Sequence, residues 1–133
     1  MAFSIDRLRD GASDAILREI EHGLPVSALR ETMRDKAVRL ADLVGIVASR
    51  RTLDRRLAGN GPLTIEEGDK LVQFAKVVAL ATHVMGDRAA AMEWLRAPQF
   101  AFNGTAPIEY MRTQTGSELV VQLLQRFRHG MLA

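Results

Sequence analysis

The sequence contains no cysteine. Without thiols it has no disulfide framework, no thiolate metal site and no cysteine nucleophile, and such a chain suits the reducing cytoplasm, where we expect it to act. Aromatic residues are also scarce, at 5% against 47% for all hydrophobic residues. This aliphatic balance is typical of packed helices. The 133 residues are enough for one ordinary domain or two small ones.

Long hydrophobic runs and a large net charge are missing as well. No apolar stretch reaches the length of about 18 residues that a membrane helix needs, and the first ten residues include four charges. We therefore expect neither a membrane span nor a secretory signal. The 18 Lys and Arg residues barely exceed the 16 Asp and Glu residues, so a positive surface for nucleic acid has to be a local one.

Helix start and stop signals account for most of the chain. N-cap residues stand at Ser13, Ser49 and Asp87, and Thr64 is followed by Glu67 in the capping-box pattern. No period-two strand pattern persists. We predict an all-α fold with helices over residues 13–22, 25–35, 36–44, 49–58, 64–85, 87–96 and 105–111, and with a last helix, set off by Gly116-Ser117, that ends at Gly130.

Catalytic and metal-binding patterns are missing. The three histidines, His22, His83 and His129, lie far apart, whereas a zinc site without cysteine normally shows histidines three or four residues apart. The phosphate-binding motifs G-x-x-x-x-G-K-S/T and G-x-G-x-x-G do not occur. No serine stands in the G-x-S-x-G motif that frames a nucleophilic serine. We therefore expect no catalytic residues, no metal and no cofactor, and an enzyme is the least supported class of function.

A cationic segment stands out against this neutral background. Four arginines occur within seven residues, and Asp54 is the only acid among them. Side chains four residues apart lie on the same flank of a helix. The N–H groups at the start of a helix can bind a phosphate, and an arginine side chain can hydrogen-bond to the edge of a guanine base. We predict a helix-turn-helix whose second helix binds DNA through Ser49, Arg50, Arg51, Thr52, Arg55 and Arg56. The alternative is a solvated face in which Asp54 pairs with the arginines.

The predicted helix over residues 64–85 is apolar on most faces between Leu71 and Val84. Such a helix must be buried all round, and in so small a chain we expect a second subunit to cover its last face. We predict a homodimer with an interface at Val72, Ala75, Lys76, Ala79, Leu80 and His83. Trp94 is expected to pack between the last helices rather than to bind a ligand.

Several short motifs follow one another in order. They are LPVSAL at 24–29, SRRTLDRRL at 49–57, LTIEEGDKL at 63–71, Gly86-Asp87 with Trp94-Leu95 and Pro98, and APIEYM at 106–111. With these motifs, residues 24–133 resemble the Xre/MbcA/ParS antitoxins. These proteins are the antitoxin halves of bacterial type II toxin–antitoxin pairs whose toxin has a RES domain.

The resemblance implies two domains and two partners. Residues 24–62 would form an Xre-like helix-turn-helix that binds the operator of its own operon, after a helical extension over residues 1–23. Residues 63–133 would dimerise and bind the toxin in a hetero-oligomer. RES toxins are understood to destroy NAD, and the antitoxin's C-terminal segment lies at the toxin's active site. Carried over, this places at the toxin surface Arg126, Arg128, His129, Met131, Leu132 and Ala133.

A second interpretation belongs to another class of function. A stand-alone helix-turn-helix transcriptional regulator would use the same arginine helix, and its C-terminal half would only dimerise. The neighbouring reading frame separates the two interpretations, because a RES-type gene beside this one supports the antitoxin.

Overall fold

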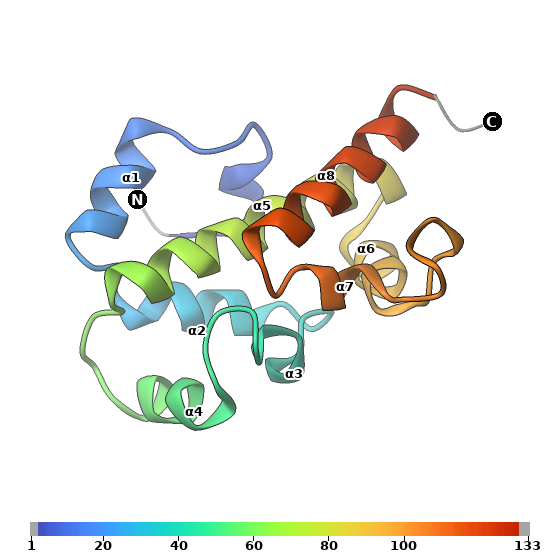
Figure 1. Ribbon diagram of the computed structural model, residues 1–133. Coiled ribbons are helices and arrows are strands. Elements are labelled where there is room, and N and C mark those ends of the chain that lie inside the picture. The colour runs from blue at the N-terminus through green and yellow to red at the C-terminus, as the bar shows by residue number, and fades with distance from the viewer. Residues whose placement is uncertain (1–2, 131–133) are drawn as a thin grey trace. The chain divides into compact units, whose positions relative to one another are not determined.

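The computed structural model describes residues 3–130 and is all-α, as predicted from the sequence (Figure 1). Among these residues no strand forms, and β contacts are limited to isolated bridges that join Val44 to Ala48 and Gln99 to Thr105. The chain divides into two compact units, residues 1–76 (unit 1) and residues 77–133 (unit 2), so that helix α5 (Ile65–Met85) contributes to both. None of the described helices combines the length and the apolar character that a membrane crossing requires.

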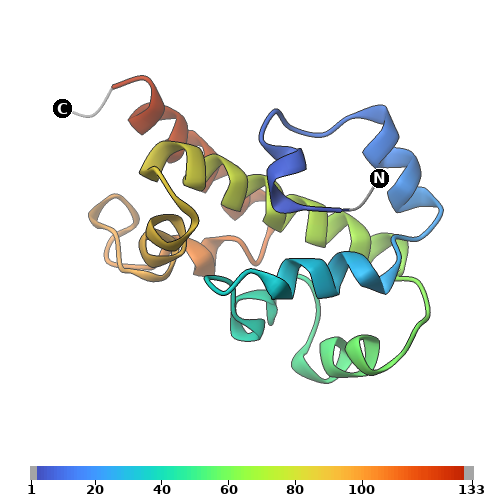
Figure 2. The ribbon, with the colours of Figure 1, turned by 180° about the vertical axis from the view of Figure 1, so that it is seen from behind.

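Unit 1 consists of short helices and the first part of α5. In chain order these are η1 (Ile5–Leu8), α1 (Asp14–Glu21), α2 (Val26–Arg34), α3 (Leu40–Leu43) and α4 (Arg50–Ala58). The 3-10 helix η1 lies beside α1, where Arg7 pairs with Glu19 at 3.3 Å (Figure 2). Helix α2 packs against α4. The core of this unit consists of nearly inaccessible side chains, among them Leu8, Leu24, Leu29, Leu43, Leu53, Leu71 and Phe74.

The predicted caps of unit 1 are confirmed. Ser13 Oγ accepts from the Ile16 N–H at 3.3 Å, so α1 begins where the sequence indicates. At the start of α5 the Thr64 N–H donates to the Glu67 carboxylate at 2.9 Å, and the Glu67 N–H donates to Thr64 Oγ1 at 3.1 Å. This reciprocal pair satisfies two N–H groups that have no partner within the helix.

Helix α3 is shorter than predicted. A helix was expected over residues 36–44, but only Leu40–Leu43 is helical. The carboxylate of Asp35 accepts from the Ala37 N–H at 3.0 Å, which makes a turn directly after α2. The carboxylate of Asp42 then accepts from the Arg39 N–H at 2.8 Å and starts the helix anew. Two aspartates that hydrogen-bond to the backbone therefore replace the first turn of the expected helix.

Unit 2 combines the rest of α5 with α6 (Arg88–Arg96), η2 (Phe100–Phe102), α7 (Pro107–Tyr110) and α8 (Gln114–Arg128). Helix α6 begins after Asp87, as predicted, because the Asp87 carboxylate accepts from the Ala90 N–H at 2.7 Å. The rings of Trp94 and Phe127 meet edge to face with centroids 5.7 Å apart. This contact confirms that Trp94 packs between the last helices. Buried aliphatic residues complete the core of the unit: Val77, Val78, Ala81, Met92, Leu95, Val120 and Leu124.

The last helix begins earlier than predicted. Gly116-Ser117 was expected to separate α8 from the preceding helix, but α8 starts at Gln114, and Thr113 Oγ1 caps it by accepting from the Gly116 N–H at 2.9 Å. Gly116 is there because the chain comes very close to the end of α7. A Cβ at this position would overlap the carbonyl group of Tyr110. The glycine therefore permits a close backbone approach rather than breaking the helix.

Gly116→Ala is expected to destabilise the protein, because the added methyl group forces the Tyr110 carbonyl and α8 apart. We expect the free energy of unfolding, measured by urea denaturation, to fall by about 1–3 kcal/mol. Gly61→Ala is the matched control, since no atom lies within 4 Å of a Cβ built there. Equal stabilities of the two variants would contradict the close approach.

Candidate functional site

Helix α4 carries the predicted DNA-binding residues, and Ser49 in the turn before it caps its N-terminus. Ser49 Oγ accepts from the Thr52 N–H at 3.2 Å and donates to Thr52 Oγ1 at 3.1 Å. The turn from α3 is closed by the Gly45 N–H, which donates to the Ala48 carbonyl at 3.0 Å. Gly45 has a φ of 80°, a conformation that favours glycine. The helix, the turn and the second helix therefore occur in the predicted order, with a turn that spans residues 44–49.

The arginines of α4 have different environments. Arg51 and Arg55 are exposed and make no ion pair with any described residue. Arg50 pairs with Asp54 at 3.6 Å, but both side chains are about 60% exposed, so the pair contributes little to stability. These three arginines leave a cationic flank open to solvent. We call the exposed residues Ser49, Arg50, Arg51 and Arg55, with the half-buried Thr52, the α4 surface.

Arg56 is held inside the fold. Its Nε donates to the two carboxylate oxygens of Glu67 at 3.0 and 3.3 Å, and its side chain is only 26% exposed. Although burial raises the pKa of Glu67, hydrogen bonds from the Thr64 N–H and from Arg56, together with the Arg56 charge, bring that pKa below its ordinary value. Glu67 thus serves the capping box and the ion pair at once, and it ties α4 to the first turn of α5.

A second structural arginine, Arg30, fixes the C-terminal end of α4, next to Arg56. The Arg30 guanidinium, on α2, donates to the carbonyl oxygen of Leu57 at 3.0 Å and to that of Gly59. Carbonyls at a helix C-terminus lack partners within the helix, and a cation there is stabilising. Leu53, which is 1% exposed, anchors the middle of α4 in the core. Leu53, Arg30 and Arg56 therefore hold the helix, while the α4 surface faces solvent.

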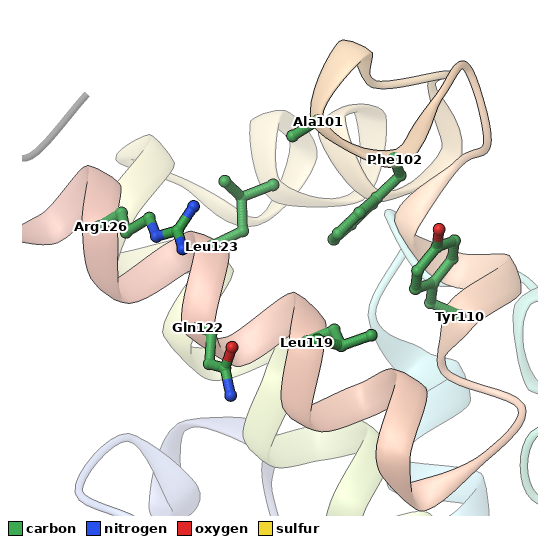
Figure 3. A pocket seen from close by; sticks show the side chains of 7 residues that line it. All are labelled: Ala101, Phe102, Tyr110, Leu119, Gln122, Leu123 and Arg126. Atoms are coloured by element: carbon green, nitrogen blue, oxygen red, sulfur yellow. The ribbon is translucent and has the colours of Figure 1, made fainter. Parts of the chain in front are cut away.

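Unit 2 contains a hollow of about 250 Å³ beside α8. Figure 3 shows Leu119 and Leu123 of α8 directed towards Phe102 and Tyr110, with Arg126 at one end. The rings of Phe102 and Tyr110 stack with centroids 4.2 Å apart and an angle of 20° between their planes. Ala101 and Gln122 complete the lining. We call this hollow the α8 groove.

The loop before the α8 groove presents an aromatic side chain to water. Phe100 is 100% exposed, the highest value among the large hydrophobic residues that the structure describes. The loop is nevertheless well braced, because Gln99 exchanges backbone hydrogen bonds with Thr105 and Gly104 at 3.2 and 2.9 Å, and its side-chain Nε2 donates to the Trp94 carbonyl at 3.1 Å. Neither the groove nor this exposed ring was predicted from the sequence. The signal available was the pair of phenylalanines before Asn103-Gly104.

The predicted toxin-binding residues lie at the end of α8 and beyond it. Arg126, Arg128 and His129 are exposed. A second hollow, of about 290 Å³, is lined by Val121, Gln122, Gln125, Arg126 and His129, and so shares Gln122 and Arg126 with the α8 groove. The other predicted residues, Met131, Leu132 and Ala133, lie outside the described residues.

The predicted dimer interface lies on α5. Val72, Ala75 and Ala79 are at most 4% exposed within the single chain, Lys76 and Leu80 are half-buried, and His83 is exposed. The apolar positions of α5 therefore need no second subunit to cover them, which corrects the reason for that prediction. Of the six predicted residues, Lys76, Leu80 and His83 alone offer surface to a partner, and the homodimer itself stays a prediction.

The two parts of the chain match two family models. Residues 15–76 match the antitoxin Xre-like helix-turn-helix domain, and residues 80–130 match the antitoxin Xre/MbcA/ParS C-terminal toxin-binding domain. Within the part of the chain that the structure describes, no three His, Asp or Glu side chains are grouped to hold a metal ion.

Relatives with curated names are similar over most of the chain. A Pseudomonas putida protein named Antitoxin Xre is 35% identical over 80 residues, which are 60% of this chain and 50% of the relative. A Photorhabdus laumondii protein of the same name is 27% identical over 122 residues, 90% of this chain and 80% of the relative. A Sphingobium protein named Prs ADP-ribosylating antitoxin is 25% identical over 91 residues, 62% of this chain and 57% of the relative. The chain thus matches about half the length of the first and third relatives.

Glu67→Gln is expected to destabilise the protein in a pH-dependent way. Since folding lowers the Glu67 pKa, the carboxylate stabilises the fold above its unfolded pKa, and this contribution is lost as the pH falls through the folded pKa. Glutamine retains an oxygen for the Thr64 N–H but loses the charge opposite Arg56. We expect the free energy of unfolding to fall by about 1 kcal/mol at pH 7 and by less at pH 3, in urea denaturation. A loss that is equal at both pH values would contradict this role.

Proposed function

Because the chain belongs to the Xre/MbcA/ParS antitoxin family, we propose that it binds and neutralises a RES-domain toxin that degrades NAD, and that it represses its own operon by binding operator DNA. Both activities place its action in the cytoplasm. One relative is named for ADP-ribosylation, a reaction whose usual donor is NAD, and that name favours a toxin of this chemistry.

The observation that carries this proposal is the succession of the two family matches along one chain. A helix-turn-helix match over residues 15–76 is followed directly by a match to a toxin-binding domain over residues 80–130. A stand-alone regulator whose C-terminal half only dimerises does not account for the second match. The antitoxin therefore takes precedence over the regulator.

The α4 surface is proposed to contact the operator. Its arginines are exposed and cationic, so they can approach phosphates and base edges in the major groove. The N–H groups at the start of α4 and the hydroxyl of Ser49 lie at the same end and suit a phosphate. Arg56 is proposed to serve mainly by holding α4 in place through Glu67.

The end of α8 is proposed to contact the toxin. Arg126, Arg128 and His129 are exposed there. Residues 131–133 are proposed to enter the toxin's active site and exclude its substrate. A homodimer that uses Lys76, Leu80 and His83 of α5 would assemble with the toxin into a hetero-oligomer.

Co-expression with the RES-type gene of the neighbouring reading frame tests the proposal. We expect the full chain to co-purify with that toxin and to keep cellular NAD at the level of cells without toxin. A chain that ends at Gly130 is expected to co-purify but to allow NAD to fall, because the proposed plug is missing. NAD depletion in the presence of the full chain would refute the antitoxin, whereas full protection by the truncated chain would refute only the plug.

Arg51→Ala combined with Arg55→Ala is expected to weaken operator binding by about 30-fold or more, because two exposed cationic contacts are lost. The measurement is a gel shift at fixed salt with the promoter DNA of the operon. Arg112→Ala, which removes an exposed arginine of unit 2, is the control. If the double variant binds the operator as tightly as the control does, the α4 surface is not the DNA reader.

A further inference from the structure

We propose that the α8 groove, together with the exposed ring of Phe100, is a docking surface for the toxin, and that it accepts an apolar side chain of the toxin with a carboxylate nearby. This inference rests on the proposed antitoxin function and extends the contact at the end of α8, with which the groove shares Arg126. It concerns a different part of unit 2 from the C-terminal residues 131–133.

The walls of the groove are mostly apolar and partly open to water, with Gln122 and Arg126 as the polar side chains of its lining besides the Tyr110 hydroxyl. Leu119 is 41% exposed although its side chain points into the groove, and the stacked Phe102 and Tyr110 form the opposite side (Figure 3). Apolar surface that stays in contact with water is unfavourable until another apolar group covers it. A hollow of about 250 Å³ has room for a single large side chain, so it suits one apolar anchor of a partner.

Phe100 has the features of an anchor residue that this chain would insert into the toxin. Its ring is fully exposed, yet the loop that carries it is braced by hydrogen bonds from Gln99 and by two residues of positive φ, Asn103 at 55° and Gly104 at 83°. An aromatic side chain on a braced loop loses little conformational entropy when it binds. Buried aromatic residues are also among the side chains that contribute most at protein interfaces.

Charge determines which partner fits. Arg126 is the only charged residue that lines the groove, and it forms no ion pair with any described residue. A bound partner therefore needs a carboxylate near its apolar anchor. A second copy of this chain that inserted its own Phe100 would bring no carboxylate, because residues 98–105 contain no acidic residue. The groove also lies wholly within residues 80–130, the part that matches a toxin-binding domain, and it adjoins the hollow at the end of α8.

Competition binding to the purified RES toxin of the neighbouring gene tests this surface. Labelled full-length wild-type chain is bound to the toxin, and unlabelled full-length variants displace it. We expect Phe100→Ala and Arg126→Glu each to compete about 30-fold less well than wild type. The controls remove an exposed apolar residue and reverse an exposed charge in unit 1: Leu17→Ala, at a side chain 53% exposed, and Arg34→Glu, at one 76% exposed. Both controls are expected to compete within about twofold of wild type.

The outcomes separate this inference from the function on which it rests. Because Phe100 is fully exposed, its truncation removes no buried contact, and an unchanged circular dichroism melt confirms that the variant folds. Wild-type competition by Phe100→Ala overturns the docking surface but leaves the antitoxin function standing. A wild-type chain that does not bind the toxin overturns the function itself. If Phe100→Ala instead converts a dimer of the free chain to monomers and leaves toxin binding unchanged, the surface joins two copies and the proposal is wrong.

Discussion

The contact between Arg56 and Glu67 ties the arginine helix to the rest of unit 1. Glu67 receives hydrogen bonds from the N–H group that starts α5 and from the guanidinium that projects from α4. One carboxylate thus determines where α5 begins and where α4 lies beside it. With Arg30 bound to the last carbonyls of α4, beside Arg56, the fold uses two arginines for structure and leaves three exposed for a ligand. A DNA-binding helix needs both kinds of arginine. The exposed side chains can contact base edges at defined positions only if the helix that carries them is held in place.

In unit 2, the close approach of Gly116 to the backbone of Tyr110 fixes the position of α8, as the Arg56–Glu67 contact fixes that of α4 in unit 1. Gly116 lets the first turn of α8 come against the carbonyl group of Tyr110, so that α8 follows α7 after a very short turn. The sharp corner brings Tyr110 and Leu119 to the same hollow, although they are nine residues apart in sequence (Figure 3). The proposed docking surface therefore depends on the absence of one side chain.

The sequence predicted most helices because their caps are local signals. Ser13, Ser49, Thr64 with Glu67, and Asp87 each hydrogen-bond within three residues, and all were recognised correctly. Gly116 was misread because it meets a carbonyl group of the preceding helix, a contact that a linear pattern does not show. The start of α3 was misread because Arg39, and not Ser, Thr, Asp or Asn, stands at its N-cap, while Asp42 bonds back to the Arg39 N–H. The site was predicted in the same uneven way. The arginine cluster was visible as composition, whereas the burial of Arg56 against Glu67 and the groove beside α8 arise only from packing.

The central claim is that one chain uses α4 for DNA and unit 2 for a toxin. Hydrogen–deuterium exchange of the full chain, measured alone, with operator DNA and with the RES toxin, tests it most directly. We expect DNA to protect the amides at the start of α4, and the toxin to protect those of residues 99–105 and of α8. Toxin-induced protection confined to α4, or no protection by either partner in these segments, would contradict it.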